Sequence, residues 1–250
     1  MRTKTDLNKL MLNSDVAKRE IASIYRCDLS LIISKIEMDL LTSIFKIPAE
    51  VIEYLPYLLD TEEIEKVAHS PSFQERQDFM FIGNFLHEPN WQTTLHLKQK
   101  IWPKIKQKLP EAKLHIYGAY ASDKVYQLQN KKEGFVVHGR ADTVDEVMQN
   151  HRILLAPIQF GAGLKGKMVD AMQNGLVSVT TPIGAEGISE NHRWNGFICT
   201  SDDEIIDKAI QIYHDEEEWI SRQKLGKAIL KDKFSALNFT AAFQEKLIAG

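Results

Sequence analysis

Three glycines and two lysines lie within one short stretch, residues 161–167. The glycines are Gly161, Gly163 and Gly166, and the lysines are Lys165 and Lys167. Glycine lets a backbone approach a ligand closely, and the free N–H groups of a first helical turn attract anions. A helix beginning here would place both lysines at its positively polarised end, which costs about 0.3–1 kcal/mol for each exposed cation. A bound anion such as a diphosphate would offset that cost; the alternative is that both lysines are solvated and the glycines form a flexible turn.

Asp170 follows Lys167 by three residues, so the two side chains share one face of the predicted helix. Two interpretations of Asp170 remain open. Its carboxylate accepts hydrogen bonds from ribose hydroxyls, as acidic residues do in dinucleotide-binding folds. Alternatively, it forms an i, i+3 ion pair with Lys167 that stabilises the helix by about 0.2–0.5 kcal/mol.

A second glycine-bearing loop, residues 83–90, reads GNFLHEPN and follows an apolar run. His87 in this loop could contact phosphate or sugar, although a single loop histidine is more often a surface residue. His115 and His138 fall inside predicted strands, where a packed or edge position is expected. No pair of histidines has metal-ligand spacing on one helix, and no nucleophile elbow or Walker lysine loop is present. These patterns predict no metal site and assign no catalytic residue.

Both loops follow strands of a predicted parallel sheet. Short apolar runs alternate with amphipathic helical stretches, which is typical of a Rossmann-like, doubly wound α/β domain. The predicted strands are residues 79–82, 113–117, 135–138, 153–156, 177–180 and 196–199; the predicted helices between and after them are residues 91–108, 144–148, 167–173, 203–214 and 216–231. With the usual strand order, the first and fourth strands flank the point where the order reverses, and ligands bind at their carboxyl ends. The two loops are therefore expected to meet at that point and to border the main pocket.

The rest of the chain is predicted to add a small, incomplete α/β segment and a terminal helix. Residues 1–60 contain two strand–helix steps, too few to close a sheet of their own. Residues 61–77 are rich in Glu and Ser and are expected to be a linker. Residues 78–232 form the expected ligand-binding domain, and residues 233–250 the expected C-terminal helix.

Composition excludes several classes of protein. Apolar residues make up 44% and charged residues 26% of the 250 residues, so a folded core is expected. The formal net charge of −3 argues against nucleic acid as a partner. No apolar stretch is long enough to span a bilayer. The two cysteines, Cys27 and Cys199, fit no metal-ligand spacing, and a reducing cytoplasm is the expected location.

At this point a resemblance becomes visible. Residues 81–90, 101–103, 109–110, 114–118 and 137–139 resemble the opening of the C-terminal domain of GT-B glycosyltransferases. Residues 161–175 (GAGLKGKMVDAMQNG) and 180–187 (TTPIGAEG) resemble the donor-site signature of the "group 1" retaining, family four-like enzymes. Residues 27–34, with Glu37, resemble the last strand and helix of the partner N-terminal domain, and residues 54–57 resemble the crossover between domains.

The resemblance implies a sugar donor carried on a nucleoside diphosphate, UDP or GDP in type, with no metal or cofactor required and transfer with retention. Asp170 stands where the family usually has the glutamate that binds the ribose, and Lys165 matches the lysine before the donor-site helix. The donor-binding residues that the resemblance and the two loops together suggest are Gly83, Asn84, His87, Asn90, Gly161, Gly163, Leu164, Lys165, Lys167, Asp170, Gly184 and Glu186.

The sequence also departs from the family pattern. The first of two motif glutamates falls on Ala162, and the usual arginine and lysine after the first strand are replaced by Asn84 and Asn90. Lys165 and Lys167 are then the expected charge partners of the diphosphate. Three functions remain open: the donor-binding half of a glycosyltransferase, a non-catalytic subunit that supports another transferase, and a sugar-nucleotide epimerase with the same fold. The acceptor is not indicated, and the expected partners are a second copy, a separate acceptor-side chain, or the inner membrane surface by peripheral contact.

Overall fold

The computed structural model describes residues 14–161, 163–189 and 192–240. The chain divides into two compact units, Met1–Leu58 and Leu59–Gly250. Each unit is α/β, as the alternation of apolar runs and helical stretches predicts.

The smaller unit is a two-stranded parallel sheet with its helices. It contains α2 (Asp15–Ile24), β1 (Ser30–Ile32), α3 (Lys35–Ser43), the 3₁₀ turn η1 (Ala49–Val51) and β2 (Ile52–Tyr54). Leu31 of β1 lies opposite Glu53 of β2. Ser34 ends the turn after β1 and caps α3, because its hydroxyl accepts a hydrogen bond from the Glu37 N–H at 3.3 Å. The two predicted strand–helix steps are confirmed here.

The larger unit is built on a six-stranded parallel sheet. Its strands are β3 (Gln77–Ile82), β4 (Leu114–Tyr117), β5 (Phe135–Gly139), β6 (His151–Ala156), β7 (Val177–Thr180) and β8 (Gly196–Ile198). The spatial order is β5-β4-β3-β6-β7-β8, which confirms the doubly wound, Rossmann-like prediction. The order reverses between β3 and β6, whose residues Phe79 and Ile153 are register partners.

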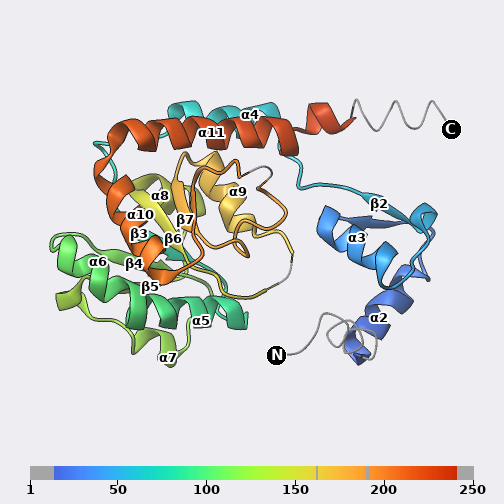
Figure 1. Ribbon diagram of the computed structural model, residues 1–250, viewed down its shortest axis with the longest axis horizontal. Helices are drawn as coiled ribbons and strands as arrows, with labels where there is room; N and C mark the ends of the chain where they lie inside the picture. Colours follow the sequence, from blue (N-terminus) through green and yellow to red (C-terminus); the bar gives the residue numbers. More distant parts are fainter. Residues whose placement is uncertain (1–13, 162, 190–191, 241–250) are drawn as a thin grey trace. The chain divides into compact units, whose positions relative to one another are not determined.

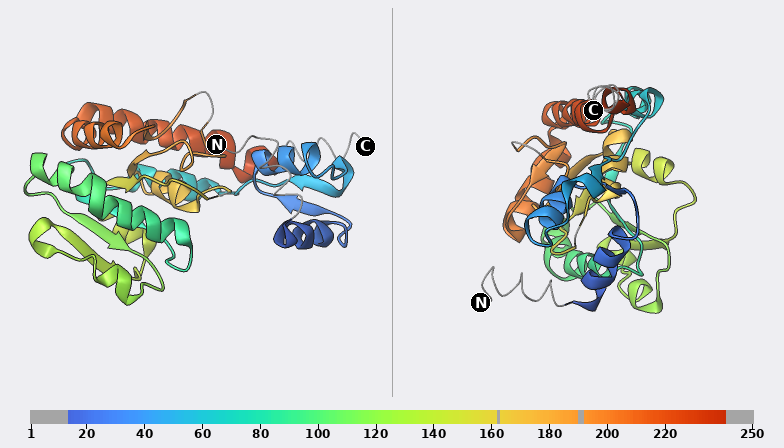
Figure 2. Two further views of the ribbon diagram at one scale, coloured as in Figure 1. Left: turned by 60° about the horizontal axis from the view of Figure 1, so that its bottom comes forward. Right: turned by 90° about the vertical axis from the view of Figure 1, so that its right-hand side faces the viewer.

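Helices cover both faces of this sheet, which explains why its central strands β6 and β7 are buried along almost their whole length. In Figure 1, α5 (Glu88–His96) and α6 (Trp102–Lys108) lie below the sheet, while α9 (Gly166–Gln173) and α11 (Glu216–Phe234) lie above it. The remaining helices and turns are α7 (Asp123–Tyr126), η4 (Lys131–Glu133), α8 (Val144–Asn150) and α10 (Asp202–His214). All four side chains of β7 are buried. The buried side chains form one core that is continuous from one helical layer to the other. Figure 2 shows the sheet between these helical layers from two further directions.

The helix predicted over residues 91–108 is interrupted. A π-helical turn, η3 (Leu97–Ile101), separates α5 from α6. Pro103 lies just after this turn and has no N–H to donate to the preceding turn, so a regular α-helical ladder cannot run through it. Leu97, Ile101 and Trp102 remain fully packed, and the interruption leaves the buried face intact.

The expected linker at residues 61–77 is not a linker. Its first part forms α4 (Thr61–Glu65) and the 3₁₀ turn η2 (Lys66–His69), with a reciprocal cap between Asp60 and Glu63. Ile64 and Val67 are buried, and the Phe73 ring meets the edge of Trp219 in α11 at 5.7 Å. This segment therefore belongs to the larger unit, which begins at Leu59.

The C-terminal boundary is also shifted. Helix α11 continues to Phe234, two residues beyond the predicted end of the domain, and Ser235 then forms a parallel β-bridge with Leu59. Residues 236–240 are helical, as predicted. The rest of the predicted C-terminal helix, from residue 241 onward, lies outside the described residues.

A buried arginine holds the helical layer above the sheet. Arg76, just before β3, is 0% exposed and donates to four backbone carbonyls. They belong to Pro71 at 3.0 Å, Met148 at 3.0 Å, His151 at 3.2 Å and Asn174 at 2.6 Å. Two of these carbonyls end α8 and α9, where helices have orphan acceptors. Arg76 thereby fixes the ends of the two helices that border the site described next.

Candidate donor site at the switch point

The two loops predicted to meet at the switch point are in contact. The loop after β3 and the loop after β6 are joined by a hydrogen bond from Lys167 Nζ to Asn90 Oδ1 at 2.6 Å. A Cβ built on Gly161 would lie 3.4 Å from Cγ of Pro89, so the backbones also run close together. The loops thus form one border at the carboxyl ends of β3 and β6.

Gly83 is required by the close approach of Asn90. A Cβ at Gly83 would lie 2.5 Å from Cγ of Asn90, which is far inside van der Waals contact. Asn90 Nδ2 donates to the Asn84 carbonyl at 2.7 Å, and Asn84 Oδ1 accepts from the Leu86 N–H at 2.9 Å. The two asparagines that replace the cations of the family pattern therefore organise the loop itself.

Lys167 is partly buried, and among the described residues no carboxylate is its hydrogen-bond partner. Its amine donates to Asn90 and lies 4.5 Å from the centre of the Phe81 ring. Burial lowers the pKa of Lys167 to about 7, although the nearby Asp170 opposes this shift. The i, i+3 ion pair with Asp170 is not formed, because the amine is directed toward the other loop.

Lys165 lies at the N-cap of α9 and folds back on its own loop. Its amine donates to the carbonyls of Gly161 at 2.9 Å and Gly163 at 2.6 Å. Gly161 and Gly163 have positive φ angles, 125° and 75°, which residues with a side chain rarely adopt. Leu164 packs against the core and anchors the loop. Lys165 therefore stabilises a turn whose carbonyls would otherwise converge without a donor.

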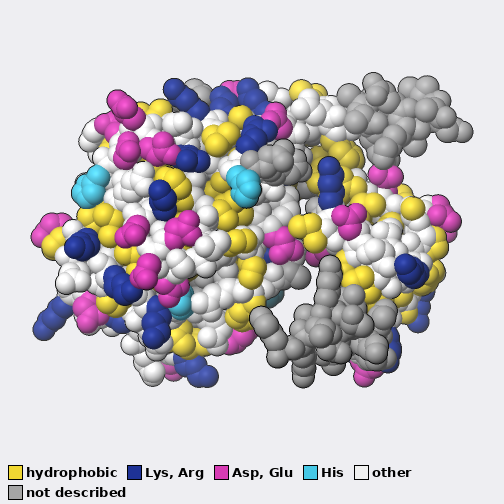
Figure 3. Space-filling model, in the orientation of Figure 1, with side chains coloured by type: hydrophobic (Ala, Val, Ile, Leu, Met, Phe, Trp, Pro, Cys, Tyr) yellow, Lys and Arg dark blue, Asp and Glu magenta, His cyan; other side chains and the backbone are white. Residues whose placement is uncertain are grey.

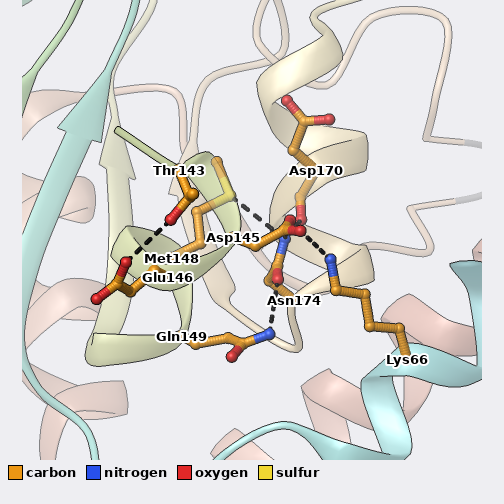
Figure 4. A network of polar contacts seen from close by, with 8 residues as sticks. All are labelled: Lys66, Thr143, Asp145, Glu146, Met148, Gln149, Asp170 and Asn174. Atoms are coloured by element: carbon orange, nitrogen blue, oxygen red, sulfur yellow. Dashed lines mark hydrogen bonds and ion pairs between the residues drawn. The ribbon is translucent and has the colours of Figure 1, made fainter. Parts of the chain in front are cut away.

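Asp170 lies on α9, three residues after Lys167. Figure 4 shows its carboxylate pointing away from a cluster formed by Lys66, Asp145 and Asn174. Burial, and to a smaller extent the nearby Asp145 carboxylate, raises the pKa of Asp170 to about 6. The group is thus ionised at neutral pH but close to its titration, as is common for carboxylates in ligand sites.

The cluster beneath Asp170 could not be recognised from the sequence. Asp145 pairs with Lys66 and accepts from Asn174 Nδ2 at 2.8 Å. The same amide nitrogen donates to the Asp170 carbonyl at 2.9 Å, and Gln149 donates to Asn174 Oδ1 at 3.1 Å. Figure 4 shows these residues arriving from η2, α8 and α9. An Asn-Gly pair at the end of a helix was the one available signal, since it marks a helix C-terminus.

Three predicted site residues lie at the margins of the two loops. Gly184 and Glu186 are in the turn after β7, where a Cβ at Gly184 would lie 2.0 Å from Thr180 Oγ1. His87 occupies the N-cap position of α5, but its side chain is exposed and makes no capping hydrogen bond. The structure places these residues at the same edge of the sheet as the loops, because all follow carboxyl ends of strands.

His115 and His138 are part of a cluster on the sheet rather than of the loops. Their ring nitrogens Nδ1 and Nε2 are 2.8 Å apart, and His115 Nε2 lies 3.2 Å from the carboxylate of Asp78. The His151 ring lies tilted against that of His115, with ring centres 4.8 Å apart, and burial lowers the pKa of His151 to about 4. Within the described part of the chain, no three His, Cys, Asp or Glu side chains are arranged as a metal site.

The fold and the glycine loops together indicate the class of protein: a doubly wound α/β domain with a ligand-binding edge at its switch point. The family follows from comparison. Residues 76–215 match the model of the family described as "Glycosyl transferases group 1", and the chain belongs to that family.

Relatives and solved structures agree with this assignment. A Klebsiella pneumoniae protein named "Uncharacterized 44.6 kDa protein in cps region" is 27% identical over 189 residues, which is 73% of this chain and 46% of the relative. The chain thus spans about half of that relative's length. Staphylococcus aureus TarM, solved with Fondaparinux, alpha-GlcNAc-glycerol and UDP, has a TM-score of 0.72 at 16% identity over 93% of this chain and 48% of that one. Anabaena HepE, solved with UDP and glucose, has a TM-score of 0.65 at 15% identity, covering 90% of this chain and 64% of that one.

The surface has no strongly basic face in the view of Figure 3, where acidic and basic side chains are interspersed over the larger unit. Among the described residues, no helix is both long and apolar enough to cross a bilayer. Both cysteines are free thiols, Cys27 exposed and Cys199 buried.

Proposed function

We propose that the larger unit binds a nucleoside diphosphate sugar of the UDP or GDP type across the two loops. The observation that carries this proposal is the Lys167–Asn90 contact, which joins the loops at the switch point and at the start of α9. In this proposal Lys165 and Lys167 neutralise the diphosphate, and Asp170 accepts hydrogen bonds from the ribose hydroxyls. Gly83, Gly161 and Gly163 let the backbone approach the donor.

The remaining predicted residues take positioning roles around the donor. Asn84 and Asn90 supply neutral hydrogen-bonding groups beside the phosphates, and His87, Gly184 and Glu186 border the sugar. Leu164 keeps the loop seated on the core. The solved structures with UDP named above support a nucleotide of this class, and the family membership supports transfer of its sugar.

The reaction we propose is transfer with retention. The bond between the anomeric carbon and the diphosphate oxygen breaks, and a bond from the same carbon to an acceptor oxygen forms on the same face. The proton of the acceptor hydroxyl passes to an oxygen of the departing diphosphate. No metal or cofactor enters this scheme, because the two lysines supply the positive charge.

A supporting subunit that binds a sugar nucleotide without catalysis is the second candidate. One observation favours it: Asn84 and Asn90 stand in place of two family cations, and their side chains are engaged within the loop, since Asn90 donates to the Asn84 carbonyl and Asn84 accepts from the Leu86 N–H. A solved complex named GtfA/B, which matches this chain at a TM-score of 0.61 and 14% identity, is an assembly of related fold. Donor hydrolysis or transfer measured after addition of an acceptor-side half distinguishes the two candidates.

Thermal denaturation with UDP, GDP, ADP and CMP tests the proposal directly. A ligand that binds only the folded state stabilises it by about 2.7 kcal/mol at a concentration of 100 Kd, so the matching nucleotide raises the Tm. The diphosphates are expected to raise it more than CMP. An unchanged Tm with all four nucleotides at millimolar concentration would refute nucleotide binding.

A further inference from the structure

A hollow of about 360 Å³ lies beside the candidate donor site, at the carboxyl ends of β6, β7 and β8. It is bordered on one side by the start of α10 and on the other by His96 of α5. Residues 157–159 line it and lead directly into the glycine loop at residues 161–167. The hollow and the candidate donor site are therefore two sides of the same loop.

The walls of the hollow are apolar. Ile158, Ile183 and Ile205 line it together with two prolines, Pro157 and Pro182. Ile158 and Ile205 are 3% and 2% exposed, so these walls are parts of the packed core and not mobile surface side chains. A ligand with one apolar face would find a preformed surface here, as in most small-molecule sites.

The rim carries a hydrogen-bonding pair of side chains. His96 Nε2 lies 2.8 Å from Asp202 Oδ1, and both residues line the hollow. The His96 side chain is 16% exposed and that of Asp202 is 42% exposed, so the pair is held between solvent and the apolar walls. The second carboxylate oxygen of Asp202 can accept hydrogen bonds from ligand hydroxyls, which are stronger when the acceptor is ionised.

The charges around the hollow disfavour anions. Among the described residues, neither lysine nor arginine lines it, whereas Asp202 does. A phosphate or carboxylate group entering the hollow would meet the Asp202 carboxylate, and the nearby Lys104 is already paired with Asp203 outside the lining. The two sides of this loop therefore suit different classes of ligand. The side with Lys165 and Lys167 suits an anion, and the hollow suits a neutral molecule.

We propose that this hollow is a binding site for a neutral saccharide ring. A pyranose ring combines an apolar face, which fits the isoleucine walls, with hydroxyls that donate to Asp202 and His96. A further step rests on the proposed function: the saccharide in the hollow is one unit of the acceptor. The acceptor is then a neutral glycan, and the glycine loop lies between it and the donor. Saccharide binding itself does not depend on that step.

Isoleucine methyl NMR spectra test the site, because three isoleucines line it. Glucose, galactose, N-acetylglucosamine, maltose and lactose are titrated into the protein, with glucuronate as the anionic counterpart. At least one neutral sugar is expected to shift the methyl signals of Ile158, Ile183 and Ile205 saturably in the millimolar range. Glucuronate is expected to bind at least fivefold more weakly than glucose. Absence of shifts with every neutral sugar up to 50 mM, roughly ten times a Kd in the low millimolar range, would overturn the proposal.

Two variants make the test specific. Ile183→Trp fills the hollow and is expected to weaken sugar binding at least tenfold, and Asp202→Asn at least threefold. Ile220→Trp is the matched control, because Ile220 lines a different hollow of about 400 Å³ beside α11. Shifts that persist in Ile183→Trp, or that disappear equally in Ile220→Trp, would contradict this location.

The same samples separate this proposal from nucleotide binding. The Tm with UDP or GDP reports the donor site, whereas the isoleucine methyl signals report the hollow. Sugar binding without nucleotide binding would refute the proposed function and leave the saccharide site standing. Nucleotide binding without sugar binding would refute the saccharide site and leave the proposed function standing.

Discussion

Lys167 Nζ and Asn90 Oδ1 are 2.6 Å apart, although 77 residues separate them along the chain. This contact joins the loop after β3 to the start of α9, across the point where the strand order reverses. It places a cation that burial has made weakly basic next to a neutral amide and an aromatic ring. An anion bound at the start of α9 would restore the charge balance that this arrangement lacks.

Changing both Lys165 and Lys167 to Ala is expected to weaken UDP or GDP binding well beyond tenfold. Hydrogen bonds to charged groups contribute roughly 1.5–3 kcal/mol each, and about 1.4 kcal/mol corresponds to tenfold in affinity. Isothermal titration calorimetry measures the change. Lys104→Ala is the control, because Lys104 forms an exposed ion pair with Asp203 and belongs to neither loop. Equal affinity of the double variant and the native chain would show that both lysines are solvated surface.

Nucleotide affinity is expected to pass through a maximum near pH 6–7. The ribose contact needs ionised Asp170, whose pKa is raised to about 6, so affinity falls as pH drops below that value. The diphosphate contact needs protonated Lys167, whose pKa is lowered to about 7, so affinity falls as pH rises above it. Calorimetry from pH 5 to pH 9 measures the profile.

Each limb of this profile has its own control. In Asp170→Asn, the fall in affinity at low pH that Asp170 causes should disappear. In Lys167→Met, the fall in affinity at high pH should disappear. Titration of the nucleotide phosphate itself contributes equally to all three proteins and cancels in the comparison. A profile identical in the native chain and both variants would show that neither residue titrates with binding.

Asp170→Asn is also expected to discriminate between sugars of the nucleotide. The native carboxylate accepts hydrogen bonds from ribose hydroxyls, so the variant should lose more affinity for UDP than for 2′-deoxy-UDP. A loss of about 1.5–3 kcal/mol is expected for the ribonucleotide. Competition binding with both nucleotides gives the ratio. The same loss for both would mean that Asp170 acts through the helix and not through the ribose.

Arg76→Met is expected to destabilise the larger unit by on the order of 3 kcal/mol or more, because several buried carbonyls lose their donor. Burial lowers the pKa of Arg76 only to about 10, so the native guanidinium stays charged at neutral pH. Urea denaturation measures the free energy of unfolding. Arg193→Met, which removes an exposed ion pair with Asp232, should change it by less than about 1 kcal/mol. Similar losses in the two variants would remove the special role of Arg76.

The 250-residue chain alone is expected to transfer sugar very slowly. In the proposed reaction, holding donor and acceptor together supplies roughly 7–11 kcal/mol of barrier lowering, and the proposed saccharide hollow holds only one unit of the acceptor. Within its described residues, 14–58, the smaller unit has a sheet of two strands, β1 and β2. The assay combines the purified chain with its best-binding nucleotide sugar and a range of acceptors, including neutral glycans. Rapid turnover by a monomer would mean that the chain already contains a complete acceptor site.

The strands of the larger unit were readable from the sequence. All six strands and the switch point between β3 and β6 follow from apolar runs of strand length separated by helical periodicity. The position of the glycine loops follows equally, because in a parallel sheet every loop after a carboxyl end lies at one edge. These are local patterns, and local patterns survive in a linear sequence.

Contacts between distant segments were decided only by the tertiary structure. Residues 61–77 are polar enough to look like a linker, yet Ile64 and Val67 are buried and Phe73 meets Trp219, which lies 146 residues further along. Lys66, Asp145 and Asn174 come from three elements and meet beneath Asp170 (Figure 4). The partner of Lys167 is Asn90 and not the neighbouring Asp170, because the fold brings the second loop within reach of the amine. Burial, and with it the pKa of Lys167, depends on which segments surround a side chain in space, and the spacing of residues along the chain does not contain that information.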